Sequence, residues 1–236
     1  YMQRYFAKDR LGDNLILQDS DLHHIKNVMR MKVDDEIEVI YDKILYICRV
    51  GDLSINEFSI VKRIDEDNEM DVEVTVAVSL VKEQKMDLIL QKLTELGVKK
   101  IIPLKMERSI IKLDEKKYKK KKERWLNICK EACEQSKRNV IPEITDIKTV
   151  KELDGDYDLK FVCSVKNKEN LINKYLQENK EYAKIIFVIG SEGGITDREE
   201  QILNDNGFVS VSLGKRVLRV ETAAIYVASI LNFCNM

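Results

Sequence analysis

The sequence predicts an α/β protein made of a small β-rich domain and a larger domain built on a parallel sheet. Short β-type runs separated by turn residues fill the chain up to residue 64, whereas strand-like and helix-like runs alternate from residue 72 onward. Such alternation is typical of a parallel sheet with crossover helices. The polar, acidic stretch 65–71 separates the two patterns. We therefore predict domains at 1–71 and 72–236.

Composition and charge narrow the class of protein. Of the residues, 44% are hydrophobic and 34% are charged, and no run approaches the roughly 20 apolar residues that span a bilayer. No secretory signal opens the chain, so we expect a cytoplasmic protein with no membrane partner. The net charge of −1 conceals a basic segment, since residues 82–139 contain 18 Lys+Arg and 9 Asp+Glu. Five cysteines without a Cys-x-x-Cys pair, and only two histidines, favour free thiols over a zinc site.

The first domain combines short strands with one expected helix. Leu15–Leu17 is a short apolar run, and residues 19–30 place apolar side chains on one helical face after a Ser/Asp start. Strands are expected at 36–40, 44–50 and 58–64, separated by Asp-Lys and Gly-Asp turn signals. By itself, such a module does not indicate a function.

The second domain alternates expected strands with expected helices. The strands are expected at 72–81, 100–106, 143–147, 159–165, 185–189 and 208–213, and the helices at 85–96, along a long segment through Trp125 and Ser136, and at 168–178, 197–206 and 222–234. In parallel α/β sheets, ligands bind at the carboxyl ends of the strands. Gly190 and Gly214 directly follow two of the expected strands and so mark a candidate site.

The first of these glycine turns reads Ile-Gly-Ser-Glu-Gly-Gly-Ile-Thr-Asp-Arg-Glu-Glu over residues 189–200. The preceding run 185–189 is wholly apolar, as expected of a strand covered on both faces. Glycines permit close backbone approach and positive φ. Thr196 and Glu199 form a capping box, which predicts that a helix begins there.

The carboxylate of Glu192 indicates which ligand this turn accepts. A helix start after a glycine turn normally attracts phosphate, but Glu192 would repel a pyrophosphate, and the spacing fits neither Gly-x-Gly-x-x-Gly nor the P-loop. A ligand without phosphates that carries a positive centre, such as S-adenosylmethionine, fits better. A plain strand-to-helix connection is the alternative interpretation of this stretch.

The second turn strengthens the prediction of a site. Residues 208–213 alternate apolar and small polar side chains into Gly214, and Arg216 and Arg219 then stand in a loop before an apolar helix. Glu221 lies at the start of that helix, where a carboxylate also suits the helix dipole.

Taken together, these stretches resemble the RsmE family, the ribosomal RNA small-subunit methyltransferases E of the SPOUT superfamily. The resemblance runs in order over almost the whole chain and is carried by the segments 82–98, 107–114, 130–142, 189–200 and 213–224. It implies a C-terminal SPOUT-type parallel sheet with a trefoil knot, an N-terminal PUA-like β-barrel that binds RNA, and a homodimer. Pattern alone would predict an ordinary doubly wound sheet, because knots are nearly absent from proteins.

The resemblance also implies an activity. Members of this family transfer a methyl group from S-adenosylmethionine to N3 of a uridine in the decoding region of 16S ribosomal RNA, forming 3-methyluridine, and we expect the substrate to be the assembled small subunit. Because N3 is a poor nucleophile while protonated, a base or a cation that stabilises charge on the flanking oxygens must assist. We assign the electrostatic role to Arg219, with Glu221 as a base or as the group that orients the arginine.

The other expected site residues fall into two sets. Those expected to hold the cofactor are Ser164, Val165, Gly190, Ser191, Glu192, Gly193, Gly194, Leu213, Gly214 and Leu218. Those expected to contact RNA are Arg4, Arg10, Lys26, Arg30, Lys32, Arg108, Lys137, Arg138 and Asn139. The apolar face of the last helix, with Ile225, Tyr226, Ser229 and Phe233, suits a dimer interface, although it could equally be core.

The sequence leaves open the role of one basic segment and two alternative functions. The basic run 115–124 can be a solvated helix start or an attachment point for RNA phosphates. A non-catalytic RNA-binding factor for ribosome assembly, or a nucleotide-phosphate enzyme on a Rossmann-like sheet, are the alternative functions. Binding tests with S-adenosylmethionine, ATP and NAD distinguish them.

Overall fold

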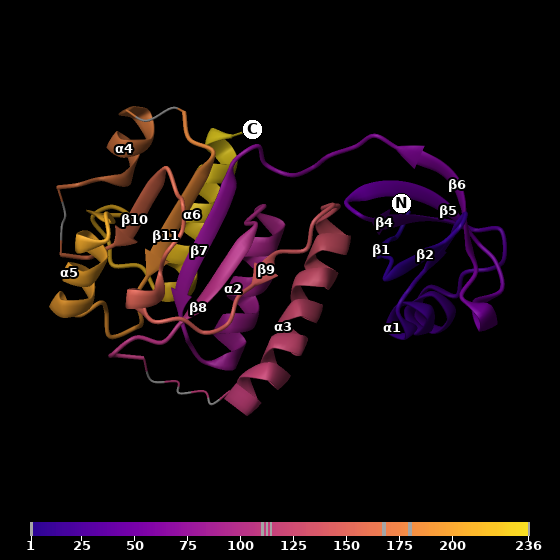
Figure 1. Cartoon of the computed structure of the whole chain (residues 1–236), viewed down its shortest axis with the longest axis horizontal. Coiled ribbons are helices and arrows are strands. Elements are labelled where there is room, and N and C mark those ends of the chain that lie inside the picture. Colours follow the sequence, from indigo (N-terminus) through magenta and orange to yellow (C-terminus); the bar gives the residue numbers. More distant parts are fainter. Residues whose placement is uncertain are drawn as a thin grey trace. The chain divides into compact units, whose positions relative to one another are not determined.

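The computed structural model describes residues 2–109, 111, 113, 115–166, 169–178 and 181–235, and the chain forms two compact units (Figure 1). The first unit contains the chain up to Glu69 together with Lys130–Val140, and the second contains Met70–Cys129 and the chain from Ile141 onward. The boundary predicted after residue 71 lies close to this change at Glu69. The sequence pattern did not indicate that Lys130–Val140 belongs to the first unit.

The first unit is a six-stranded sheet with strand order β1-β4-β5-β6-β3-β2. Its strands are β1 (Arg4–Phe6), β2 (Asp9–Leu11), β3 (Asn14–Ile16), β4 (Glu36–Tyr41), β5 (Ile44–Val50) and β6 (Phe58–Ile64). The expected helix is present as α1 (Asp19–His23), which continues as a π-helical segment, η1 (His24–Met29), and a 3₁₀ turn, η2 (Leu53–Ile55), precedes β6. Strands β1 and β2 were not expected from the sequence, because these short segments contain charged residues and form no apolar run.

Arg4 ties Lys130–Val140 into the first unit. Its side chain is only 1% exposed, and its Nε donates to Glu38 Oε2 at 2.8 Å. Its Nη1 donates to Asn139 Oδ1 at 2.9 Å. Arg138 forms an ion pair with Glu69. Arg4, Arg138 and Asn139 are therefore buried structural residues, which corrects the expectation that these three contact RNA.

The second unit is built on a fully parallel sheet with strand order β12-β10-β11-β7-β8-β9. Its strands are β7 (Glu73–Ser79), β8 (Lys100–Leu104), β9 (Glu143–Ile144), β10 (Leu159–Cys163), β11 (Lys184–Ile189) and β12 (Val209–Val211). Its helical elements are α2 (Glu83–Glu95), α3 (Glu115–Ser136), η3 (Val150–Glu152), α4 (Ile172–Glu178), α5 (Asp197–Asp205) and α6 (Val220–Cys234). The predicted parallel α/β architecture is confirmed. The expected helix at 168–178 begins at Ile172, and its first residue, 168, lies outside the described residues.

Helices cover both faces of this sheet (Figure 1). Alternate residues of each central strand enter different cores: Phe187 packs in the core that contains residues of α2, α3, α4 and α6, whereas Ile186 and Val188 pack with residues of α5 and η3. This alternation explains why the central strands are apolar on both faces. Among the described residues, no helix is both long and apolar enough to cross a membrane. The trefoil knot stays a prediction.

The strand order places the carboxyl ends of β7 and β11 next to each other. Along the chain β8 and β9 are added on one side of β7, whereas β10, β11 and β12 lie on its other side. Loops that follow neighbouring strands at such a reversal diverge and leave a crevice between them. The segments after Ser79 and after Ile189 therefore face one another at the expected ligand edge.

The first prediction concerns the stability of the first unit. We expect Arg4→Met to lower the free energy of unfolding of the whole chain by roughly 3 kcal/mol, because it leaves buried acceptors without their donor. Urea unfolding followed by circular dichroism measures this. Arg49→Met is the matched control: Arg49 is half exposed and its carboxylate partners are 4.0 Å away, so a loss of less than about 1 kcal/mol is expected. Equal losses would show that Arg4 has no special structural role.

Candidate functional site

The turn after β11 has a compact shape that only small residues permit. A Cβ on Gly190 would lie 2.5 Å from Cγ1 of the buried Ile195, and Gly194 has a φ of +79°. Gly194 N donates to Ser191 O at 2.9 Å, and Ser191 Oγ donates to Gly194 O at 3.2 Å. The turn is thus fixed by its own hydrogen bonds.

A buried glutamate joins this turn to the loop after β8. Glu199 is 3% exposed and completes the predicted capping box with Thr196 at the start of α5. Its Oε1 also accepts a hydrogen bond from Glu107 N at 2.8 Å. Next to it, Arg108 Nη1 donates to Gly193 O at 2.9 Å. The loop after β8 and the turn after β11 are thereby held together, although Glu107 and Glu199 are 92 residues apart in sequence.

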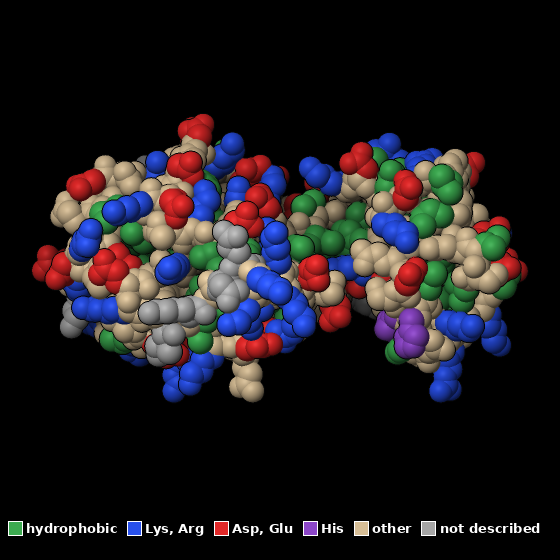
Figure 2. Space-filling model, turned by 60° about the horizontal axis from the view of Figure 1, so that its bottom comes forward, with side chains coloured by type: hydrophobic (Ala, Val, Ile, Leu, Met, Phe, Trp, Pro, Cys, Tyr) green, Lys and Arg blue, Asp and Glu red, His purple; other side chains and the backbone are tan. Residues whose placement is uncertain are grey.

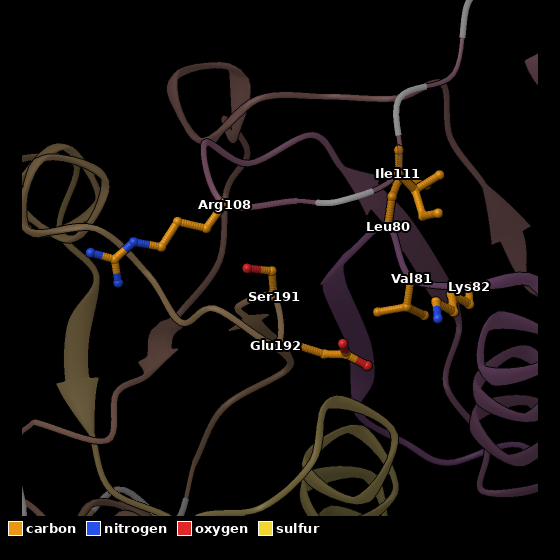
Figure 3. Close-up of a pocket in the computed structure, with 7 residues that line it drawn as sticks. All are labelled: Leu80, Val81, Lys82, Arg108, Ile111, Ser191 and Glu192. Carbon is orange, nitrogen blue, oxygen red and sulfur yellow. The ribbon is translucent and has the colours of Figure 1, made fainter.

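A pocket opens between the loops that follow β7, β8 and β11 (Figure 3). It is lined by Leu80, Val81, Lys82, Arg108, Ile111, Ser191 and Glu192. In Figure 3 the Glu192 carboxylate points towards Val81 and Lys82, whereas the Arg108 guanidinium points away from them. The pocket therefore combines an apolar wall with one carboxylate and two basic residues, Lys82 and Arg108, at the crevice that the strand order predicts.

Lys85, in the first turn of α2, bridges two carboxylates at this crevice. Its Nζ forms an ion pair with Glu192 and lies 3.7 Å from Glu221 Oε2 at the start of α6. The hydrogen bond to Glu192 raises the pKa of Lys85, and the same bond lowers the pKa of Glu192. Lys85 was not among the site residues expected from the sequence. Its signals there were its place at the start of the expected helix 85–96 and within the segment 82–98, which carries the family resemblance.

Arg219 and Glu221 do not pair with each other. The Glu221 side chain is 13% exposed, and its ion-pair partner is Lys85. Apart from that contact, Glu221 Oε2 is buried and accepts no hydrogen bond within the described part of the chain. Arg219 occupies the N-cap position of α6 and is exposed. Among the residues that the structure describes, no hydrogen bond or ion pair engages its guanidinium, although its positive charge acts on both Lys85 and Glu192.

The remaining expected cofactor residues lie in the neighbouring loops after β10 and β12. Ser164 N donates to Val211 O at 2.9 Å, which joins the two loops. Gly214 has a φ of +120°, and its N–H donates to Ser212 Oγ. Leu213 and Leu218 pack against the larger core. Val165 is 58% exposed. None of the residues expected in these two loops lines the pocket of Figure 3.

The expected RNA contacts that are not buried lie on both units. Arg10 is half-buried, and Lys26, Arg30 and Lys32 are exposed, all on the first unit. Lys137 Nζ pairs with Glu38 Oε2 at 2.7 Å. Arg108 is exposed on the second unit, beside the pocket. The exposed side chains of this set remain predicted RNA contacts.

Comparisons with known proteins cover nearly all of the chain. A family model described as an RNA methyltransferase domain matches residues 68–232, and one described as an RNA methyltransferase PUA domain matches residues 17–62. The ribosomal RNA small subunit methyltransferase E of Bacillus subtilis (strain 168) is 34% identical, covering 98% of this chain and 96% of that protein. The protein of the same name from Aquifex aeolicus (strain VF5) is 33% identical, covering 98% and 99%.

Solved structures agree with these matches. A ribosomal RNA small subunit methyltransferase E from Neisseria gonorrhoeae, bound to S-adenosyl methionine, aligns with a TM-score of 0.88 and 31% identity, covering 99% of this chain and 98% of that one. A methyltransferase from Legionella pneumophila, in complex with the bound cofactor SAM, aligns with a TM-score of 0.90 and 29% identity over the same shares. The predicted PUA-like first domain and the predicted methyltransferase fold of the second are confirmed.

The site itself yields a prediction about the first glycine turn. We expect Gly190→Ala to weaken binding of S-adenosylmethionine at least tenfold, because the new Cβ meets a buried side chain at 2.5 Å and displaces the turn. Calorimetric titration measures the affinity. Gly193→Ala is the control in the same turn, since its Cβ would lie 3.0 Å from the Cβ of the exposed Arg108, whose loop can shift slightly. We expect Gly193→Ala to lose less affinity for S-adenosylmethionine. An unchanged affinity of the Gly190→Ala variant would remove this turn from the cofactor site.

Proposed function

The chain belongs to the family of ribosomal RNA small subunit methyltransferases E, and from this premise we propose that it methylates N3 of a uridine in the decoding region of 16S ribosomal RNA, on the assembled small subunit. As a member, it is an S-adenosylmethionine-dependent ribosomal RNA methyltransferase. The proposed methylation at N3 rests on the guanidinium of Arg219, which is unengaged within the described residues and lies beside the Glu192–Lys85–Glu221 bridge. It offers a positive charge at the edge where the cofactor is expected.

The residues at the crevice fit S-adenosylmethionine. Leu80, Val81 and Ile111 offer apolar surface to an adenine ring, and the backbone of residues 190–194 offers hydrogen-bonding groups. Two carboxylates, those of Glu192 and Glu221, lie at the crevice, and a carboxylate attracts the positive sulfonium of the cofactor. When bound, the cofactor supplies an electrophilic methyl carbon on a sulfonium. The residues proposed to hold it are Ser164, Val165, Gly190, Ser191, Glu192, Gly193, Gly194, Leu213, Gly214 and Leu218.

Arg219 is proposed to make N3 a better nucleophile. As N3 of the uridine loses its proton, negative charge spreads onto the flanking carbonyl oxygens, and a fixed guanidinium beside them stabilises that charge. The N-cap position fixes the backbone of Arg219 at the start of α6, with φ of −66° and ψ of 158°. Its side chain is exposed and therefore free to meet an incoming base.

Glu221 is proposed to act through Lys85. Its carboxylate lies 3.7 Å from the Lys85 ammonium and accepts no hydrogen bond within the described part of the chain. Because the partner of Glu221 is Lys85, the proposed role is to hold the lysine that also binds Glu192, and not to orient Arg219.

The proposed reaction is tested by methyl transfer from labelled S-adenosylmethionine to small ribosomal subunits that lack the modification, followed by nucleoside chromatography. Label that runs with 3-methyluridine is expected. Label on another nucleoside would overturn the N3 assignment. Absence of both transfer and cofactor binding would favour a non-catalytic RNA-binding factor.

In the same assay, Arg219→Ala should lower kcat by about 100-fold or more while the affinity for S-adenosylmethionine stays within about threefold, because the guanidinium acts on charge that develops in the transition state. Arg216→Ala is the matched control from the same exposed loop, and little change is expected. If both variants lose activity equally, or if Arg219→Ala keeps kcat, the role given to Arg219 is wrong.

Glu221→Gln separates positioning from proton acceptance. A positioning role predicts weaker cofactor binding and a pH dependence of kcat parallel to that of the unaltered protein. If Glu221 is instead the base, the rate of the variant should rise steeply with pH, as N3 loses its proton to solvent.

We also propose that a second copy of this chain packs on α6. Tyr226 and Phe233 are one seven-residue repeat apart on this helix and are 42% and 75% exposed, and Val217 just before it is 80% exposed. Such neighbouring apolar side chains favour a protein interface.

This proposal predicts that Phe233→Asp shifts the protein from dimer to monomer in sedimentation equilibrium, because it places a charge in an apolar contact. Leu11→Asp is the control: Leu11 is 66% exposed and lies on the first unit. It should leave the dimer intact. An unaltered protein that is monomeric at all concentrations tested would remove the dimer from the proposal.

A further inference from the structure

The basic side chains in the first half of α3 have two different environments. Lys121 and Arg124 both pair with Glu83, at 3.0 Å and 2.9 Å, and Lys122 pairs with Asp146 at 3.0 Å. These three side chains attach α3 to the body of the second unit. Their charges are compensated by the carboxylates that they contact.

Lys116, Lys119 and Lys120 are exposed instead. Within the described ranges, their ammonium groups make no hydrogen bond or ion pair. Their spacing of three and four residues places them on one side of the helix, roughly opposite the buried Tyr118 and Trp125. Figure 2, turned so that the lower end of α3 in Figure 1 comes forward, shows lysine and arginine side chains gathered in this region. We call these three residues the α3 lysine face.

The α3 lysine face is unfavourable for the isolated protein. Lysines near the start of a helix oppose the positive end of its dipole. Lys116 and Lys120 also repel each other at a spacing of four residues. A merely solvated surface needs no such concentration of one charge, whereas an anionic partner would compensate all three lysines.

Two connections limit the distance between this face and the pocket. Ile111 lines the pocket, and Lys116 follows five residues later, so the two Cα atoms are separated by at most about 18 Å. In addition, Glu83 anchors Lys121 and Arg124 and begins α2, and two residues later Lys85 holds Glu192 of the pocket. The helix that presents the α3 lysine face is thus fixed to the same short segment that organises the site.

We propose that the α3 lysine face binds successive phosphates of the ribosomal RNA strand that delivers the target base to the pocket. The inference rests on the proposed function and identifies where its RNA substrate is held. Lys116 and Lys120 are about 6 Å apart along the helix axis, so their flexible side chains can each meet a different phosphate of one strand. Binding releases counterions and therefore depends on salt.

The test is a variant with Lys116, Lys119 and Lys120 each changed to Gln. We expect a raised KM for small ribosomal subunits, with affinity for S-adenosylmethionine unchanged in calorimetry. The slope of log affinity for protein-free 16S ribosomal RNA against log salt should fall by about 2, because each phosphate contact on a single strand contributes about 0.7. Between about 50 and 200 mM salt the RNA affinity of the unaltered protein falls, and in the variant this fall should be about 20-fold smaller.

The control removes the same charge elsewhere on the second unit, with Lys151, Lys174 and Lys184 changed to Gln, all of which are exposed. If both triple variants change the salt slope equally, or neither does, the proposed surface is wrong. If the α3 variant binds intact subunits more weakly but binds protein-free RNA normally, the lysines contact a ribosomal protein and the proposal is overturned. Failure of the proposed function is a separate result, since the unaltered protein would then form no 3-methyluridine.

Discussion

The ion pairs of Lys85 are the constraint on which the site depends. One ammonium holds the carboxylate of Glu192 from the turn after β11 and stands 3.7 Å from Glu221 at the start of α6. Three segments from distant parts of the chain are thus joined at one charge. Without the lysine, two carboxylates would face each other at the crevice and repel. With it, both carboxylates are held at the crevice by one shared cation.

This arrangement refines the charge argument from the sequence. Glu192 alone was interpreted as a group that excludes pyrophosphate, and the structure shows that its charge is compensated by Lys85. Glu221 adds a second carboxylate at the crevice, which is paired with the same lysine. Glu221 could be located at a helix start from the sequence, but its partner could not. The spacing of apolar residues in the sequence shows on which face of helix α2 Lys85 lies. It does not show which distant loop that face contacts.

Much of the fold could be predicted because the strands of the second unit are long, apolar and punctuated by glycine. The turn at Gly190 was located for this reason, and its tight geometry is explained by the contact with Ile195. Strands β1 and β2 were missed because these short segments contain charged residues and form no apolar run. The assignment of Lys130–Val140 to the first unit was also missed. It depends in part on the bond from Arg4 to Asn139, which is 135 residues away in sequence, and no local pattern records such a contact.

Two arginines show that the sequence alone does not determine whether a charged side chain is buried or exposed. Arg4 and Arg219 are the same side chain, yet one is 1% exposed and held by carboxylates, and the other is exposed and unengaged within the described residues. A buried guanidinium is tolerated only where acceptors surround it, since removing it from water is costly. An exposed one keeps its hydration and costs the free protein little. The backbone of Arg219 is already fixed by the start of α6, so less ordering remains when a substrate arrives, and a guanidinium held in this way can favour the developing charge over the neutral base.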